Sequence, residues 1–459
     1  MTTCSILRLP LLLAAIWISA GRGLAADRHV LVVSIDGFAA SLLDDPRAPI
    51  PTIRRLAGQG AVATGGMTVV NPSVTWPNHA TLLTGVRPEK HGVLANGGLV
   101  RGAVGVPVNV DAKRDQKDLL RAPNILAAAH AAGLRTADIN WPCTRAAADL
   151  DDSFPDTPDQ VEHMTPRLRT ELIGLGLLAD ETQKSFMASS AVGRDLVWTE
   201  AACHVIRSRR PHLMMVHLLN VDATHHAFGA HTPAGYTANG YADMCLARML
   251  AALDEAGIRE QTTVIVLADH GFATTPKAIR PNVLLRQKGL LTVDGGKIAT
   301  AQVHVYPEGG VGLVYCTDPG TADTLRQSVK ELLTGLEGVA DVLLPEQFAA
   351  HGLPHPRRYD QAPDAVLVAA DGYAVSGSVD GETFVTGNVE AKTSLGSHGF
   401  LATLPKMNAL CILSGDGIRR GVRLEGVANT DIAPTIATVL GLPAFPADGR
   451  VLQDALVDR

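Results

Sequence analysis

Three apolar runs along the chain have the length and composition of buried parallel strands. They are HVLVVSI (29–35), HLMMVHLL (212–219) and TTVIVLA (262–268). Such short, nearly continuous runs are typical of strands that are covered on both faces of a sheet. In contrast, YADMCLARMLAALDEAG (241–257) places its apolar residues at helical spacing. Strands that alternate with such helices predict a doubly wound, mostly parallel α/β sheet flanked by helices.

The hydrophobic pattern changes in the last third of the chain. Short alternating strands, AQVHVYP (301–307) and VGLVYC (311–316), are followed by one amphipathic helical segment and a Pro-rich loop. This pattern predicts a smaller α+β insertion over residues 275–390. We expect the main α/β domain, which carries the catalytic candidates described below, to comprise residues 27–274 and a closing part over 391–459.

The first residues have the pattern of a secretory signal. Arg8 precedes the apolar run LPLLLAAIWISA, and the small residues of GRGLAAD follow it. This order predicts a signal peptide over residues 1–26, with cleavage near Ala25 or Ala26, and therefore export to the periplasm or the outside. The run is short for a membrane span, and no later run reaches membrane length. An uncleaved anchor stays open as the alternative.

Composition excludes some classes of partner. The formal net charge is −6 and aromatic residues make up only 4% of the chain, so nothing indicates a nucleic-acid-binding surface. Five cysteines follow the signal segment, an odd number with no Cys-x-x-Cys pair, which fits neither a zinc ribbon nor a disulfide framework. We expect buried free thiols, and one or two disulfide bridges stay open. These cysteines are Cys143, Cys203, Cys245, Cys316 and Cys411.

Acidic and histidine residues follow the predicted strands. In an open α/β sheet, ligands gather at the carboxyl ends of the strands, so these side chains are expected to meet. Alone, each has an ordinary explanation, such as the turn that an Asp-Gly pair forms after a strand. Together, carboxylate oxygens and imidazole nitrogens suit zinc, and six ligands suffice for two ions. The candidates are Asp36, Asp222, His226, Asp269, His270 and His398.

A candidate nucleophile lies in NPSVTWPNHATLLTG (71–85). We expect Thr75 to be the N-cap of a helix with Pro77 in its first turn. The helix dipole there favours negative charge, either an alkoxide or a bound phosphate. A free Thr hydroxyl is a poor nucleophile, but a coordinated metal ion can activate it. Thr75 is therefore predicted to be both cap and nucleophile.

With these residues in view, the chain resembles the alkaline phosphatase superfamily and, within it, the nucleotide pyrophosphatase/phosphodiesterase family. The resembling segments run in family order over nearly the whole chain after the signal segment. The blocks around Thr-x-Pro-Asn-His and Asp-His-Gly are the most specific ones. The segments are LVVSIDGF, PSVTWPNHATLLTGVRPEKHGVLAN, INWPCT, NVDATHHAFG, VIVLADHGF, GSHGF and NTDIAPTIATVLGLP.

The resemblance implies a mechanism and a set of ligands. It implies a metal-dependent hydrolase of phosphodiester or pyrophosphate bonds that forms a phosphothreonine at Thr75 and acts on a small phosphodiester or nucleotide. Asn96 would contact the phosphoryl oxygen. Two Zn²⁺ ions are implied, although other divalent metals stay open. The first would be held by Asp36, Asp269, His270 and the Thr75 oxygen, and the second by Asp222, His226 and His398.

Three positions depart from the family pattern and leave substrate preference open. His225 stands where many relatives have Gly, and it is a rival to His226 as a ligand. Ala95 replaces a common Asp, and Cys143 replaces a Gly. A phosphomonoesterase or a phosphonate hydrolase of the same superfamily stays an alternative, and so does a non-catalytic secreted binding protein. A sulfatase is disfavoured because its nucleophile derives from Cys, where this chain has Thr75.

Two further points stay open in the sequence. Trp76, next to the predicted nucleophile, could stack on a flat group of the substrate or simply pack against the start of the helix. The sequence does not indicate an oligomeric state.

Overall fold

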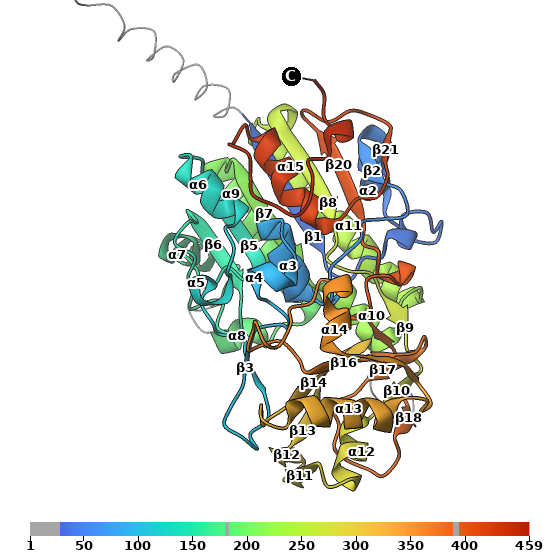
Figure 1. Ribbon diagram of the computed structural model, residues 1–459. Helices are drawn as coiled ribbons and strands as arrows, with labels where there is room; N and C mark the ends of the chain where they lie inside the picture. Colours follow the sequence, from blue (N-terminus) through green and yellow to red (C-terminus); the bar gives the residue numbers. More distant parts are fainter. Residues whose placement is uncertain (1–27, 180–182, 389–393, 459) are drawn as a thin grey trace, which may run out of the picture.

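The main sheet has eight strands, in the order β21-β2-β20-β8-β1-β7-β5-β6 (Figure 1). The computed structural model describes residues 28–179, 183–388 and 394–458, so the predicted signal peptide lies outside it. The strands are β1 (His29–Ile35), β2 (Ala61–Ala63), β5 (Thr136–Pro142), β6 (Asp152–Asp156), β7 (Leu213–Leu218), β8 (Thr262–Leu267), β20 (Cys411–Gly415) and β21 (Val422–Leu424).

The three strands predicted from the apolar runs are neighbours at the centre of this sheet. β1 pairs in parallel with β7 on one side and β8 on the other, with Val32 opposite both Met215 and Ile265. Every residue of the three strands is buried, which explains their continuous apolar character. Because they are parallel neighbours, the segments that follow them meet at one edge. The predicted α/β class is confirmed, with β20 as an antiparallel strand of the mixed sheet.

Helices cover both faces of the sheet. On one face, α11 (Pro233–Glu255) packs against α9 (Ala191–Arg209) and α2 (Pro51–Gln59). On the other, α3 (Thr75–Thr84) and α6 (Ile125–Ala131) contact α15 (Ile432–Val439) (Figure 1). The helix predicted at 241–257 is the second part of α11. Its true start is earlier because the Thr232 hydroxyl caps it by accepting a hydrogen bond from the Gly235 N–H.

A group of smaller sheets lies beside the main one, built by elements from β10 to β18 (Figure 1). A four-stranded antiparallel sheet has the order β13-β14-β16-β15, and a three-stranded sheet has the order β17-β10-β18. The chain then returns through β19, which pairs with β9 next to the main sheet. The bounds are β9 (Ala273–Thr274), β10 (Lys277–Ile279), α12 (Pro281–Gln287), β11 (Leu291–Asp294), β12 (Lys297–Ala301), β13 (Val303–Glu308), β14 (Val311–Cys316), α13 (Ala322–Leu333), β15 (Val339–Leu343), α14 (Pro345–Phe348), β16 (Ala365–Ala369), β17 (Tyr373–Val375), β18 (Val385–Gly387) and β19 (Gly396–Ser397).

The remaining elements connect the main ones. They are α4 (Pro88–His91), β3 (Gly98–Val100), β4 (Asn109–Asp111), α5 (Gln116–Leu119), α7 (Pro166–Gly174), α8 (Gln183–Met187) and α10 (Asn220–Phe228). All five cysteines of the described residues are buried and free, as expected from their spacing. Among the described helices, none is both long and apolar enough to cross a membrane.

A buried carboxylate fixes the start of α10. Asp195 on α9 accepts hydrogen bonds from the backbone N–H groups of Leu219 (2.8 Å) and Asn220 (3.1 Å). These amides stand where β7 ends and α10 begins, so they have no partner within the helix. Asp195 has no exposed surface, and burial raises its pKa to about 7. This side chain therefore sets how α10 leaves the sheet.

We predict that Asp195→Ala lowers the free energy of unfolding by about 1–3 kcal/mol, because two buried amides lose their acceptor. Urea denaturation followed by circular dichroism measures this difference. Asp195→Asn keeps one acceptor oxygen and should lose less. Equal stability of the Ala variant and the wild type would contradict the capping role.

Candidate active site

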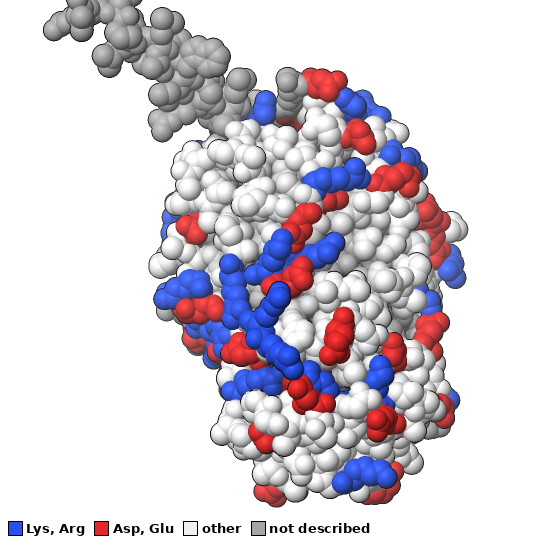
Figure 2. All heavy atoms as spheres, in the orientation of Figure 1, with Lys and Arg blue, Asp and Glu red and all other residues white. Residues whose placement is uncertain are grey.

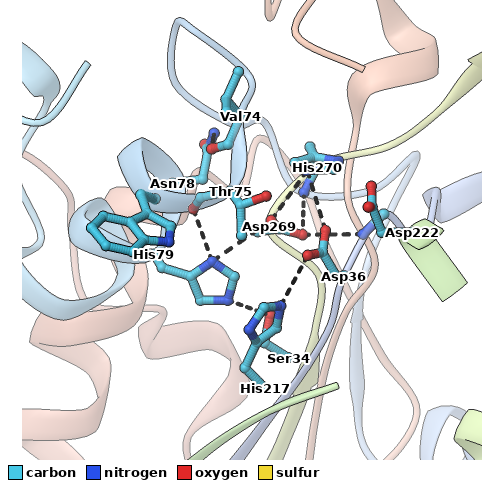
Figure 3. A network of polar contacts seen from close by, with 12 residues as sticks. Ser34, Asp36, Val74, Thr75, Asn78, His79, His217, Asp222, Asp269 and His270 are labelled. Atoms are coloured by element: carbon cyan, nitrogen blue, oxygen red, sulfur yellow. Dashed lines mark hydrogen bonds and ion pairs between the residues drawn. The ribbon is translucent and has the colours of Figure 1, made fainter. Parts of the chain in front are cut away.

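The six predicted ligands lie together at the carboxyl edge of the central strands. Asp36 follows β1, Asp269 and His270 follow β8, Asp222 lies in the first turn of α10 and His398 follows β19. Two groups have ligand atoms within 4.8 Å of one another. One is Asp36, Asp269 and His270, and the other is Asp222, His270 and His398. Figure 3 shows His270 above the carboxylates of Asp36 and Asp269, with Asp222 beside them.

His226 adjoins the second group because its side chain contacts Asp222. Its Nε2 lies 3.4 Å from Asp222 Oδ1, and the Nε2 of His398 lies 3.6 Å from the same oxygen. Both His225 and His226 contact Phe272, with ring centroids 5.2 and 4.9 Å apart, but of these two only His226 forms an ion pair with Asp222 within the described residues. The geometry therefore favours His226 over its rival His225 as a partner of Asp222.

Backbone carbonyls orient three of the imidazoles. The Nδ1 atoms of His226, His270 and His398 lie 3.0, 3.1 and 3.1 Å from the carbonyl oxygens of Gly396, Gly271 and Ser73. A carbonyl can only accept, so each Nδ1 carries the hydrogen and each Nε2 keeps a lone pair. This arrangement is typical of metal-binding histidines.

Burial keeps two of these rings neutral. It lowers the pKa of His270 to about 3 and that of His398 well below its usual range. Their Nε2 lone pairs are therefore available to a metal ion at neutral pH.

Several ligand atoms at the centre of the site are buried without a hydrogen-bond partner in the described part of the chain. They are Asp36 Oδ1, Asp222 Oδ1, Asp269 Oδ2 and His270 Nε2. His270 Nε2 lies 3.3 Å from Asp36 Oδ1 and 3.2 Å from Asp269 Oδ2. Such converging lone pairs repel and are costly to bury. Oxygen and nitrogen donors in this mixture fit a divalent cation such as zinc.

The carboxylates have altered affinities for protons. Burial, followed by the charges of Asp269 and Asp222, raises the pKa of Asp36 well above its usual range. Burial also raises the pKa of Asp269, to about 7. A bound cation would reverse this effect by stabilising the ionised carboxylates.

Thr75 is the first residue of α3, beside these ligands (Figure 3). The prediction that its side chain caps the helix is wrong. Val74 occupies the N-cap position, and Asn96 Oδ1 accepts the hydrogen bond from the Trp76 N–H at 2.9 Å. A residue from a distant loop thus satisfies this amide, and no hydrogen bond within the described residues engages the Thr75 hydroxyl. Because its oxygen is occupied, Asn96 keeps its Nδ2 hydrogens for another acceptor.

Two buried histidines, which were not predicted from the sequence, form a second layer around the candidate ligands (Figure 3). His217 Nε2 lies 3.0 Å from Asp36 Oδ2, and its Nδ1 lies 3.0 Å from the carbonyl oxygen of Asn140. His79 Nδ1 lies 2.9 Å from the Thr75 carbonyl oxygen and 3.6 Å from Asp269 Oδ2. The signal for His217 was a single imidazole within an otherwise apolar central strand.

This second layer leaves one oxygen of Asp36 available to a metal ion. His217 occupies Oδ2, while Oδ1 faces His270 without a hydrogen-bond partner among the described residues. Such contacts orient a ligating carboxylate and tune its affinity for a metal.

The structure favours the packing role of Trp76. Its side chain is buried, and its indole Nε1 donates a hydrogen bond to Asp156 Oδ2 at 3.0 Å. A buried ring whose polar edge is hydrogen-bonded has little surface left for stacking on a substrate.

Comparison with known proteins identifies the family. The sequence profile of the type I phosphodiesterase / nucleotide pyrophosphatase family matches residues 30–401, which contain the whole site. The chain belongs to this family. The resemblance noted in the sequence is thereby confirmed.

Two relatives show how far the similarity extends. A fission yeast (Schizosaccharomyces pombe) pyrophosphatase/phosphodiesterase described as uncharacterized is 24% identical over 92% of this chain and 78% of its own length. Human ectonucleotide pyrophosphatase/phosphodiesterase family member 1 is 22% identical over 91% of this chain, which spans only 40% of that longer protein.

A solved structure supports the fold. Murine ectonucleotide pyrophosphatase / phosphodiesterase 5 has a TM-score of 0.68 and 22% sequence identity, covering 94% of this chain and all of that chain. At this identity the likeness concerns the fold, which it confirms as α/β.

We predict that His217→Phe lowers zinc affinity by about 10–100-fold, because Asp36 loses the contact that orients it. Isothermal titration calorimetry of metal-free protein measures this affinity without depending on activity. His217→Gln, which keeps an N–H donor, should recover part of the loss. Unchanged affinity in the Phe variant would show that His217 only fills space.

We also predict that zinc binding releases more protons at about pH 6 than at about pH 8. Below its pKa of about 7, Asp269 keeps a proton that the metal must displace, whereas above it the carboxylate is already ionised. His270, whose pKa is about 3, is neutral at both values. Titration calorimetry in buffers of different ionisation enthalpy counts the protons. Release that does not change with pH would contradict the raised pKa.

Proposed function

We propose that this protein is a two-zinc phosphodiesterase or nucleotide pyrophosphatase that works through a phosphothreonine at Thr75. The observation that carries the proposal is the convergence of unpartnered buried ligand atoms beside a Thr hydroxyl at a helix start. The family assignment supports hydrolysis of phosphodiester or pyrophosphate bonds.

The residues divide into two sets of ligands. The first set is Asp36, Asp269, His270 and the Thr75 oxygen, and the second is Asp222, His226 and His398. Two divalent ions held there would supply Lewis-acid chemistry that activates the Thr75 hydroxyl and stabilises negative charge on the phosphoryl group. Other divalent metals with the same preference for oxygen and nitrogen could replace zinc.

The chemical steps belong to the chain's own residues. Thr75 loses its hydroxyl proton to solvent, and its Oγ1 attacks phosphorus in line with the departing oxygen. The new Oγ1–P bond forms as the bond to the leaving group breaks, and the leaving oxygen takes up a proton. Water then hydrolyses the phosphothreonine and restores the hydroxyl. Asn96 donates from Nδ2 to a phosphoryl oxygen throughout, while its Oδ1 stays on the Trp76 N–H.

The positions of two cations favour a diester over a monoester. A monoesterase needs a positive group to balance the second phosphate charge, and Arg87 and Lys90 are the nearest basic residues to Thr75 in sequence. Lys90 instead forms an ion pair with Asp448, whose carboxylate also accepts a hydrogen bond from the backbone N–H of Arg87. Both side chains are exposed, whereas most of the candidate ligands are buried, and this gives no support to a role in holding a second phosphate charge.

A nucleotide is the first substrate to test. An inactive variant of murine ectonucleotide pyrophosphatase / phosphodiesterase 5 has been solved in complex with AMP. We propose that this chain likewise accepts a nucleotide or another small phosphodiester.

We further propose export, since the first residues read as a signal peptide and relatives carry the names ectonucleotide pyrophosphatase and venom phosphodiesterase.

We predict that purified protein hydrolyses bis(p-nitrophenyl) phosphate faster than p-nitrophenyl phosphate, and that Thr75→Ala lowers diester turnover by at least about 10³-fold. A chelator should abolish turnover because it removes the proposed ions from their carboxylate and imidazole ligands, and added zinc should restore it. Thr300→Val, an exposed Thr on β12, is the matched control and should keep full activity.

Rapid acid quench and peptide mass spectrometry should find a phosphorylated peptide that contains Thr75. Faster monoester turnover would place the protein in the phosphatase branch. Full activity of Thr75→Ala would exclude the phosphothreonine.

A further inference from the structure

A cavity of about 350 Å³, lined by both polar and apolar residues, opens beside His226, and the small sheets build its outer wall. Its polar lining includes Ser397 from the loop of His398, Ser376 and Ser378 after β17, and Thr386 on β18. This cavity is separate from the residues that would hold the metal ions, except for His226 at its rim. Its volume suits a small ligand group.

Hydrogen bonds tie the wall of this cavity to the candidate ligands. The Val375 N–H donates to the Gly309 carbonyl oxygen at 2.7 Å, and the Gly310 N–H donates to the His398 carbonyl oxygen at 2.7 Å. Gly309 has a positive φ of 75°, and a Cβ there would lie 2.3 Å from the His398 oxygen. The wall of the cavity and the loop of His398 are therefore joined by direct backbone contacts.

The hydroxyl groups of Ser376, Ser378 and Thr386 can still donate, whereas Ser397 Oγ already donates to the His398 carbonyl oxygen at 3.3 Å. Ser376 Oγ accepts a hydrogen bond from the Ser378 N–H at 3.2 Å, and Ser378 Oγ accepts one from the Asp380 N–H at 3.2 Å. Accepting leaves each hydroxyl hydrogen free to point elsewhere. No hydrogen bond within the described residues engages the Thr386 hydroxyl. The wall thus offers several groups that donate and accept at once.

The side chains that line the cavity do not suit a nucleobase or an ammonium group. The described residues that line the cavity include no Phe, Tyr or Trp to stack on a nucleobase, and no Asp or Glu to pair with an ammonium group. Arg280 is the one Lys or Arg among them. Its guanidinium donates to two neutral oxygens, the Asp380 carbonyl oxygen and Thr383 Oγ1, and its Nε is buried without a hydrogen-bond partner among the described residues. A group with several hydroxyls matches the hydroxyls of the wall, and the guanidinium adds further donors to the same lining.

We infer that this cavity is a subsite for a polyhydroxylated alcohol, such as glycerol or a sugar ring, that is esterified to the reacting phosphoryl group. The inference rests on the proposed function. Thr75 lies beside the group of Asp36, Asp269 and His270, whereas the cavity adjoins His226. A phosphoryl group bound between the two thus directs one ester arm into the cavity.

The test compares two symmetric diesters, bis(glyceryl) phosphate and dipropyl phosphate, which differ only in their hydroxyls. The wild type should favour the glyceryl ester by at least about tenfold in kcat/KM, measured by release of the alcohol. The double variant Ser376→Ala/Thr386→Val should lower this ratio by about tenfold. Comparing this preference between the wild type and the double variant cancels the difference in intrinsic reactivity between the two diesters.

Matched control substitutions are Ser328→Ala and Thr300→Val, which remove exposed hydroxyls elsewhere on the small sheets and α13 and should leave the ratio unchanged. Bis(p-nitrophenyl) phosphate is included to separate the two proposals. If the wild type hydrolyses it but shows no preference for the glyceryl ester, or hydrolyses neither alkyl diester, the subsite is overturned while the diesterase stands. A ratio that is the same in the double variant also overturns the subsite. If no diester is hydrolysed, the proposed function itself fails.

Discussion

The candidate site depends on the burial of several carboxyl and imidazole groups at one point without hydrogen bonds between them. His270 Nε2 lies within 3.3 Å of both Asp36 Oδ1 and Asp269 Oδ2. None of these three atoms has a hydrogen-bond partner among the described residues. Electron pairs placed this way repel unless a cation joins them. Burial raises the pKa values of Asp36 and Asp269, and the charge of Asp222 adds to both shifts.

The fold holds this arrangement from outside. Four of the six candidate ligands have a second contact that fixes them: His217 orients Asp36, and backbone carbonyls orient His226, His270 and His398. These partners lie on β7, on β19, after β8 and before α3, so the packed fold around the site holds the side chains in place. The small sheets add a second function, since their hydroxyl-lined wall is bonded to the loop of His398. The same loop therefore connects a candidate ligand with a candidate specificity site.

Local patterns predicted much of this. The apolar runs predicted β1, β7 and β8 and their parallel packing, because a strand buried on both faces can only be apolar throughout. The polar residues directly after these runs were expected to meet for the same reason. The sequence could not show which group caps α3, since Asn96 reaches it from another loop, and Thr75 was wrongly expected to cap it.

The sequence by itself thus determined the fold class and the set of candidate ligands, because these depend on periodicity and on residues next to strand ends, and it determined the family through the resemblance of its motifs. The tertiary structure alone decided contacts between distant segments. It favoured His226 over His225, placed His217 behind Asp36, and brought the serines after β17 beside the ligand loop. The contact of His217 with Asp36 joins residues 181 positions apart. No local pattern encodes the direction in which a side chain turns once the chain is packed.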